Sequence, residues 1–425
     1  MLTTNYNIDE RIVESVIARE ATSQKIDSLL TTYLEKFEPE YTNATHKEHV
    51  NLFIRGLLSN LDRKTIEPVA LTLKGPTAVR GLQNFFSRSP FNTTGVLHKY
   101  QTMVADTISA ENGMISIDES DFVKKGNASP GVARQYCGRL GKTENCQAGV
   151  FVAYASDEGH GLLDSRLYIP QKWFGADFTG RRRKAQIPED IHFQSKNQMA
   201  AGMIQNIMKN THIKAKWIGC DSSFGSDHTF LDSIPDSMYY FAGVRKNEKI
   251  YMSMPEMINL EHAGQGGKRR LHPSFAHVYV ESIVNNETIP WKRVPLADSA
   301  KGMIYADTKC IRCVSTRASM SGDSGNTRLI VPGSEIWLYI RKHLNDEIKY
   351  FVSNAPSDTA REELDKACIM RWPIEQCFEE CKSYLGMSHY ETQVYCAWER
   401  HMLFVMMAHF FTTLLRLSLK KKSAI

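Results

Sequence analysis

The hydrophobic residues near the start of the chain follow the periodicity of amphipathic helices. Apolar residues recur three or four positions apart in three stretches, 12–17, 26–34 and 50–61, and this spacing places them on one face of a helix. The pattern predicts a helical N-terminal segment over residues 1–110.

A further short helix is predicted at residues 77–86, directly after Pro76, because proline is favoured in the first turn of a helix. Arg80 and Gln83 share its polar side, and both side chains carry groups that bind the edges of DNA bases. We therefore interpret them as candidate DNA-binding residues. The pattern leaves open an ordinary surface helix that packs through apolar residues such as Phe85.

The pattern changes after Gly113, where strand-like stretches alternate with helical ones. Five stretches have the composition of β-strands: 114–120, 147–156, 162–170, 215–223 and 238–244. Helices are predicted at 198–208 and, more briefly, at 228–234. The order of three strands, helix, strand, helix and strand over residues 111–245 predicts an α/β fold with a mixed, RNase H-like sheet.

Residues 246–355 interrupt this alternation and are predicted to form a β-rich insertion in the catalytic core. The strand-like stretches are 277–284, 311–316, 328–333, 335–342 and 348–354. A loop rich in glycine and lysine is expected at 264–270. Helix returns from Asp358, so residues 356–425 are predicted to complete the core and to form the C-terminal helices.

The longest apolar stretch runs from Met402 to Leu417. Polar residues interrupt it at His409, Thr412, Thr413 and Arg416. The stretch falls short of the ~20 residues that a helix needs to span a bilayer. We therefore predict a buried C-terminal helix and no membrane association.

Composition indicates a globular protein with more than one domain. The chain has 425 residues, of which 42% are hydrophobic and 23% charged, and its net charge of +5 permits a nucleic-acid partner without requiring one. Nine cysteines are scattered along it, and its polar first residues do not resemble a signal peptide, so we expect a reduced, cytoplasmic protein. The pairs Cys310/Cys313 and Cys377/Cys381 are interpreted as free thiols, because a zinc site needs two converging pairs.

Two of the predicted strands end in aspartate. Asp118 closes the first strand and Asp221 the fourth, and adjacent strand ends place such side chains next to one another. Two close carboxylates repel, and a divalent metal ion removes the conflict. Mg²⁺ prefers carboxylate and water oxygens, and two ions about 3.5–4 Å apart activate a nucleophile and stabilise the leaving oxygen of a phosphoryl transfer.

The third carboxylate is expected in the segment CIMRWPIEQCFEECKSYLG. Cys368, Arg371, Glu375 and Lys382 are three, four and seven residues apart, which places them along one stripe of a helix, although Pro373 either starts a new turn or kinks the helix. In the functional interpretation Glu375 binds metal and the two basic residues bind DNA phosphates. A surface helix with paired charges is the alternative, and Glu379 is the rival acid one turn later.

Two regions of the chain resemble a known family. Arg-x3-Glu-x6-Lys around Glu375 resembles the second half of the Tyr-Arg-Glu-Lys signature of DDE insertion-sequence transposases. The segment IDESDFVKKGNASPGVARQYCGRLGKTENCQAGVFVAYAS resembles the first-Asp region of the IS701-like branch, and IEQCFEECKSYLGMSHYE with WERHMLF resembles its last catalytic helices. The similarity covers residues 76–415 and, more weakly, the helical N-terminus. The resemblance implies that this N-terminal segment, residues 1–110, is a DNA-binding domain.

The resemblance implies a transposase that hydrolyses DNA strands at transposon ends and joins the freed 3′-hydroxyls to target DNA. It implies that Asp118, Asp221 and Glu375 bind two Mg²⁺ ions, for which Mn²⁺ substitutes, and that Arg371 and Lys382 contact the DNA backbone. The implied assembly is a homodimer on paired double-stranded inverted-repeat ends. It would work in the bacterial cytoplasm, at the nucleoid when bound to DNA.

One position departs from the family signature. The signature has tyrosine three residues before the arginine, whereas this chain has Cys368, so a thiol replaces the family's phenol. Glu119, beside Asp118, occupies a position where the family often has a second acid. We expect Glu119 to support the metal site without binding the metal.

Other basic and aromatic residues are candidate DNA contacts. They are Lys124, Lys125, Arg181, Arg182, Arg183 and Trp291. The lysines follow the first aspartate, and the arginines form a basic run for which a solvated loop is the alternative. Trp291 and Trp337 are candidates for stacking on a displaced base, with core packing as the alternative for each. Trp291 is the better candidate because it lies between Pro290 and Lys292.

Two other functions remain open at this point. One is a DNA-binding protein that derives from a transposase and no longer catalyses, which the departure at Cys368 would accommodate. The other is an RNase H-type nuclease that acts on RNA–DNA hybrids. The three acids at positions 118, 221 and 375 favour the active transposase.

Overall fold

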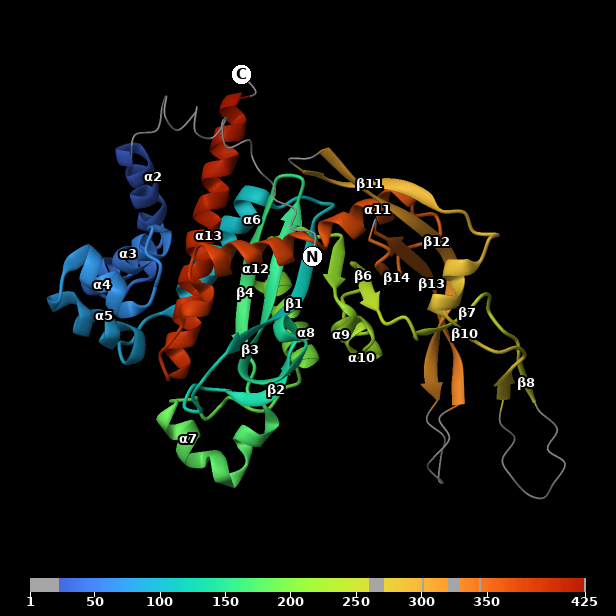
Figure 1. Ribbon diagram of the computed structural model, residues 1–425, viewed down its shortest axis with the longest axis horizontal. Coiled ribbons are helices and arrows are strands. Elements are labelled where there is room, and N and C mark those ends of the chain that lie inside the picture. Colours follow the sequence, from blue (N-terminus) through green and yellow to red (C-terminus); the bar gives the residue numbers. More distant parts are fainter. Residues whose placement is uncertain (1–22, 260–270, 300–301, 320–328, 344, 424–425) are drawn as a thin grey trace. The chain divides into compact units, whose positions relative to one another are not determined.

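The computed structural model describes residues 23–259, 271–299, 302–319, 329–343 and 345–423 (Figure 1). It divides into two compact units. The core unit contains the described residues of Ile8–Lys216 and Met370–Ile425, and the insertion unit contains those of Trp217–Ile369. The helix expected at 12–17 and the loop expected at 264–270 lie outside the described residues.

The N-terminal part of the core unit is helical, as predicted. Its helices are α2 (Ser23–Glu35), α3 (Ala44–Leu58), α4 (Ile66–Lys74), α5 (Thr77–Ser87) and α6 (Thr93–Ile108), with a short 3-10 helix at Glu38–Glu40. The apolar stripe of α3 is fully buried, and its N-cap Asn43 accepts a hydrogen bond from the backbone N–H of His46. Neither α4 nor α6 was predicted from the periodicity.

The sheet of the core unit consists of four antiparallel strands. They are β1 (Met114–Val123), β2 (Ala133–Cys137), β3 (Lys142–Ser156) and β4 (Gly159–Leu167). β3 is central, because β1 pairs with one edge of it while β2 and β4 pair with its other edge. Two helices follow these strands, α7 (Thr179–Lys184) and α8 (Lys196–Asn210). Ser195 and Gln198 form a reciprocal capping box that starts α8.

Three helices end the chain. They are α11 (Arg361–Met370), α12 (Pro373–Ser383) and α13 (Tyr395–Ser423). By length and composition α13 could cross a membrane over Tyr395–Leu419, but 61% of its most apolar window is buried within the protein. The prediction of a buried C-terminal helix is therefore confirmed, and α13 packs on α3, α5, α6 and β4 of the core unit (Figure 1).

The insertion unit combines one parallel strand pair with a larger antiparallel sheet. The parallel pair is β5 (Trp217–Cys220) and β6 (Tyr239–Val244), connected through the short helices α9 (Ser222–Gly225) and α10 (His228–Leu231). Beyond β6 the order is β14 (Ile348–Ser353), β13 (Leu329–Lys342), β12 (Gly302–Ser319), β7 (Lys249–Tyr251) and β10 (Val278–Tyr279). β11 (Lys292–Ser299) pairs with β12, and β8 (Met257–Asn259) forms a separate pair with β9 (Leu271–Pro273).

Two details of the insertion differ from the prediction. The stretches 328–333 and 335–342 belong to one continuous strand, β13. Most of the stretch 277–284 is a 3-10 helix at Val280–Asn285 instead of a strand. Its carbonyl groups are bound by the buried Lys309, whose Nζ donates to the carbonyls of Val284 and Asn286 at 2.8 Å each. The mixed α/β class with a helical N-terminal region is confirmed.

A buried lysine ties α3 to the end of α12, and its removal should destabilise the core unit. Lys64 is 7% exposed, and its Nζ donates to the carbonyls of Leu57, Ser59 and Tyr384 at 2.5–2.6 Å. Lys64→Met would leave these carbonyls without the charged donor, so we expect the free energy of unfolding to fall by about 2–3 kcal/mol. Urea denaturation measures this loss. Lys74→Met, at an exposed lysine of α4, is the control and should change stability by less than about 0.5 kcal/mol.

Candidate active site

Asp118 lies on the face of β1 that α12 covers. It pairs with Phe151 of β3, and the Phe151 ring contacts Phe378 of α12 edge-on, with ring centroids 5.2 Å apart. Directly paired residues of a ladder share a face of the sheet, and so do residues two and four apart along a strand. Phe122, four residues after Asp118, lies below the Lys382 ammonium of α12, 6.0 Å from the ring centroid. Asp118 therefore faces α12.

One expectation about Asp118 is wrong. Asp118 does not close its strand, because β1 continues to Val123 and its ladder with β3 runs on to the pair Val123–Cys146. The carboxylate oxygen Oδ1 of Asp118 accepts a hydrogen bond of 2.7 Å from the backbone N–H of Glu119. This bond orients the carboxylate along its own strand.

Glu375 lies in the first turn of α12, one turn before Phe378. Pro373 takes the first position of this helix, and α11 has already ended at Met370, so the proline starts a new helix and the expected continuous stripe from position 368 to 382 is wrong. Arg371 lies in the break, is 5% exposed, and donates from Nη2 to Oε1 of Glu375 at 2.6 Å. Arg371 therefore neutralises Glu375 from a buried position.

Lys382 closes the other end of α12. Its ammonium lies 5.6 Å from the ring centroid of Phe378 and is half-buried. Burial lowers the pKa of Lys382, and the nearby Arg139 lowers it further, whereas Asp121 and Asp118 raise it. The acid in the first turn and the cation in the last turn both suit the dipole of the helix. Lys382 thus lies within electrostatic range of Asp118.

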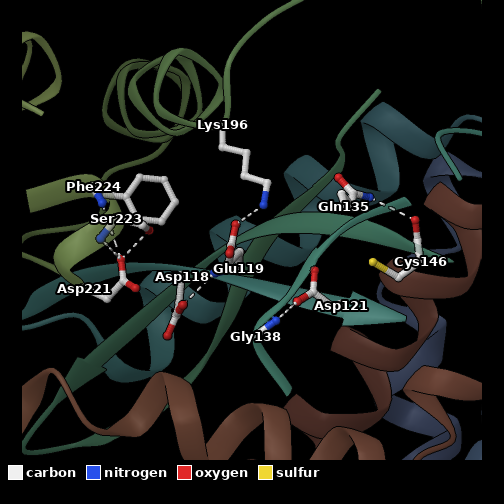
Figure 2. Close-up of polar contacts among 10 residues, drawn as sticks. All are labelled: Asp118, Glu119, Asp121, Gln135, Gly138, Cys146, Lys196, Asp221, Ser223 and Phe224. Carbon is white, nitrogen blue, oxygen red and sulfur yellow. Dashed lines mark hydrogen bonds and ion pairs between the residues drawn. The ribbon is translucent and has the colours of Figure 1, made fainter. Parts of the chain in front are cut away.

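The acids that flank Asp118 and Glu375 point elsewhere. Glu119 lies on the opposite face of β1 and forms an ion pair with Lys196 of α8 (Figure 2). Asp121, also on that face, is 6% exposed, and its Oδ2 accepts a 2.7 Å hydrogen bond from the backbone N–H of Gly138. Glu379, the rival of Glu375, is exposed on α12.

Asp221 belongs to the insertion unit, where it follows β5 and caps α9. Its Oδ1 accepts hydrogen bonds from the backbone N–H and the hydroxyl of Ser223, at 2.9 and 2.6 Å, and from the N–H of Phe224 at 3.4 Å (Figure 2). These donors fix the carboxylate at a helix N-terminus. A side chain at Gly225 would meet the carbonyl oxygen of Gly243 in β6 at 2.0 Å, so glycine is required for α9 to lie this close to the strand.

Cys368, which replaces the family's tyrosine, lies in α11 and is 1% exposed. Its Sγ is 3.3 Å from Nη1 of Arg341 in β13, within the insertion unit. The chain passes from the insertion unit to the core unit directly after Ile369. The signature therefore spans two units, because Cys368 belongs to the insertion unit whereas Arg371 and Glu375 belong to the core unit.

An ion-pair cluster that the sequence did not predict connects α12 to α13. Glu380 accepts from Nε2 of His409 at 2.7 Å and from Nη2 of Arg416 at 2.8 Å, both on α13. Burial opposes ionisation of Glu380, but the hydrogen bonds and charges of His409 and Arg416 outweigh it and lower its pKa to about 2. The signal was the pair of polar residues, seven positions apart, that interrupts the apolar C-terminal stretch.

The other candidate DNA contacts differ in exposure. Arg80 and Gln83 are exposed on α5, which packs through Leu82, Phe85 and Phe86. Lys125 is exposed, whereas Lys124 is half-buried and donates from Nζ to the carbonyl of Tyr390 at 2.5 Å. Burial lowers the pKa of Lys124 to about 8.

The basic run at 181–183 is helical instead of a loop, since it lies in α7. Arg181 lies over the ring of Phe178 at 5.1 Å and Arg182 over that of Phe174 at 4.8 Å, while Arg183 is exposed. In the insertion unit Trp291 is 36% exposed, and the buried Lys309 lies 4.8 Å from its ring centroid. Trp337 donates from its ring N–H to the carbonyl of Pro356 at 2.9 Å, which is a packing role.

The donor groups fit divalent metal ions by their chemistry. Within each unit, the described residues contain no group of three or more His, Cys, Asp or Glu side chains able to hold a metal ion. The core unit instead offers Asp118 and Glu375 on one side of its sheet, and the insertion unit offers Asp221. Carboxylate oxygens are the protein ligands that Mg²⁺ and Mn²⁺ prefer. All nine cysteines lie in the described residues, and none forms a disulfide bond.

Comparison with known families identifies the class. The family model described as "DDE superfamily endonuclease" matches residues 36–302, which is more than half of the chain. The protein belongs to the DDE superfamily of endonucleases, whose members use divalent metal ions.

The comparison with curated proteins points to a narrower group. The chain is 23% identical over 240 residues to the probable transposase for insertion sequence element IS701 of Microchaete diplosiphon. That similarity covers 56% of this chain and 58% of the relative. A solved structure, the NurA nuclease from Sulfolobus solfataricus, matches 78% of this chain and 93% of that one at 11% identity, with a TM-score of 0.24.

Proposed function

We propose that this protein is a DNA transposase that cleaves the ends of an insertion sequence and transfers the strands to target DNA. The observation that carries the proposal is the placement of Asp118 and Glu375 on one side of the core sheet, with Lys382 within electrostatic range, in a chain that belongs to the DDE endonucleases. Asp221 is the third acid. Two Mg²⁺ ions, or Mn²⁺ in their place, supply Lewis acidity and an activated nucleophile at these carboxylates when bound.

The residues around the carboxylates position the acids and the DNA. Arg371 holds Glu375 through its 2.6 Å ion pair, and the Ser223 and Phe224 donors hold Asp221. Lys382 faces the DNA backbone near the cut, where a cation offsets the charge of the phosphodiester. In this way the protein fixes the acids in orientations that a phosphate and its metal ions can use.

We further propose the DNA contacts outside the catalytic acids. Arg80 and Gln83 of α5 read base edges. The phosphates are bound by Lys124, Lys125, Arg181, Arg182 and Arg183, of which Lys125, Arg181 and Arg183 are exposed. Trp291 is proposed to stack on a displaced base. The substrate is double-stranded DNA, both inverted-repeat ends and target, held by a homodimer in the cytoplasm and at the nucleoid.

Metal removal tests the reaction class. We expect the purified protein to cleave a plasmid that carries the inverted repeats flanking its gene in Mg²⁺ or Mn²⁺, and to lose all cleavage in EDTA, because the carboxylates alone cannot activate water. Gel analysis of end-labelled DNA measures this. Cleavage that persists in EDTA would overturn the metal mechanism. Preference for an RNA–DNA hybrid over the duplex ends would instead identify an RNase H-type nuclease, and end binding with no cleavage in either metal would identify a DNA-binding protein.

A further inference from the structure

The hairpin that joins β2 to β3 carries exposed aromatic and basic side chains beside the candidate active site. We call residues 133–146 the Tyr136 hairpin. Along β2 the burial alternates: Ala133 and Cys137 are buried, while Arg134 and Tyr136 project to solvent. Tyr136 is 61% exposed, so its ring is open to a partner in solution. The neighbouring side chains determine which partner this ring fits.

The hairpin is fixed to the strand that carries Asp118. The backbone N–H of Gly138, two residues after Tyr136, donates to the buried carboxylate of Asp121 at 2.7 Å. Within the hairpin, Nε2 of Gln135 in β2 donates to the carbonyl of Cys146 in β3 at 2.9 Å (Figure 2). Asp121 lies three residues after Asp118 on β1. The exposed side chains are therefore held at a defined place relative to the catalytic acid.

The charge of the hairpin surface is positive. Arg134 and Arg139 are exposed. Burial lowers the pKa of Lys382, and Arg139 is close enough to that lysine to lower its pKa further. The acid of the hairpin, Glu144, pairs across the ladder with Gln135, on the face opposite to Tyr136, and lies 3.6 Å from Lys142. The face that presents Tyr136 thus combines an aromatic ring with arginines and carries no competing carboxylate of the hairpin.

We propose that the Tyr136 hairpin binds a single, unpaired DNA strand next to the cut, with Tyr136 stacked on a base and Arg134 and Arg139 on phosphates. An aromatic ring among basic side chains suits single-stranded DNA, because the ring stacks on a base while the basic side chains bind the phosphates. A duplex offers its bases no free face along its length, so the ring selects a strand that has separated from its complement. The inference rests on the proposed function, because it names the state of the DNA at that site.

Binding of a model strand tests the proposal. The probe is fluorescein-labelled oligothymidylate that contains one 2-aminopurine, offered as a single strand and as the matching duplex. We expect the wild type to bind the single strand and quench the 2-aminopurine, and Tyr136→Ala to bind it about tenfold more weakly, since stacking contributes ~1–3 kcal/mol per base. Tyr136→Phe keeps the ring and should bind within about twofold of the wild type. Tyr279→Ala, at a 46% exposed tyrosine of the insertion unit, is the matched control and should change nothing.

The outcomes separate this proposal from the proposed function. Equal affinity of Tyr136→Ala and wild type, or a loss in Tyr136→Phe as large as in Tyr136→Ala, overturns the stacking role even if the wild type cleaves DNA. Loss of quenching in Tyr136→Ala supports the stacking role even if the wild type fails to cleave in Mg²⁺. Thermal unfolding of each variant confirms that the fold is unchanged, as expected for so exposed a side chain.

Discussion

Asp118→Asn, Asp221→Asn and Glu375→Gln are each expected to reduce Mg²⁺-dependent DNA cleavage by about 10³-fold or more. Each change removes one negative charge while nearly keeping the shape of the side chain. A metal ion at such a site contributes several kcal/mol of transition-state stabilisation, and every 1.36 kcal/mol corresponds to about tenfold in rate. Binding of the transposon ends should persist, because arginine and lysine residues carry most of the affinity for DNA.

The matched control for these variants is Glu379→Gln. Glu379 is exposed on α12, one turn after Glu375, so its change alters the same helix by the same charge. We expect Glu379→Gln to cleave like the wild type. Single-turnover cleavage of end-labelled DNA, with gel-shift binding in parallel, measures both properties. The assignment of Glu375 fails if Glu379→Gln loses cleavage and Glu375→Gln keeps it.

Glu380→Gln is expected to cost about 3 kcal/mol of the free energy of unfolding. The Glu380 side chain is 16% exposed, and it binds His409, which is 1% exposed, together with Arg416. Removing one partner of a buried ion pair leaves the other charge uncompensated, which typically costs about 3–5 kcal/mol, and the amide keeps part of the hydrogen bonding. Urea denaturation of Glu380→Gln beside Glu379→Gln measures the loss, and equal stabilities would contradict it.

The effect of Glu380 should depend on pH in a defined direction. Its pKa in the folded protein is lowered from 4.5 to about 2, so the folded state favours the ionised form. The stabilisation is present in full above the unfolded pKa of 4.5 and is lost as the pH falls through about 2. The difference in unfolding free energy between wild type and Glu380→Gln should therefore shrink from pH 4.5 downward.

Features that depend on local pattern could be predicted from the sequence. The β-rich alternation around Asp118 and the apolar spacing of α5 each need only a few consecutive residues, and both match the structure in kind. The sequence did not decide whether one kinked helix or two separate helices surround Pro373, because proline permits either. The structure has the new helix, and so places Arg371 in a buried break between two helices.

Features that depend on distant contacts could not be predicted. Glu380 finds its partners 29 and 36 residues away, and no periodicity in either segment identifies that pairing. The stretch 277–284 has the composition of a strand, but Lys309 from β12 binds the carbonyls that a neighbouring strand would need. In both cases tertiary contacts override the local preference.

The packing around Cys368 limits which side chains this position can hold. The thiol contacts Arg341, and the neighbouring Tyr339 is fully buried with its hydroxyl 2.7 Å from the Asp365 carboxylate. A tyrosine at position 368 would have to displace the guanidinium of Arg341 or the ring of Tyr339. Overpacking a filled core in this way costs about 1–3 kcal/mol. The single change Cys368→Tyr is therefore disfavoured, and the site would accept a tyrosine only with compensating changes in β13.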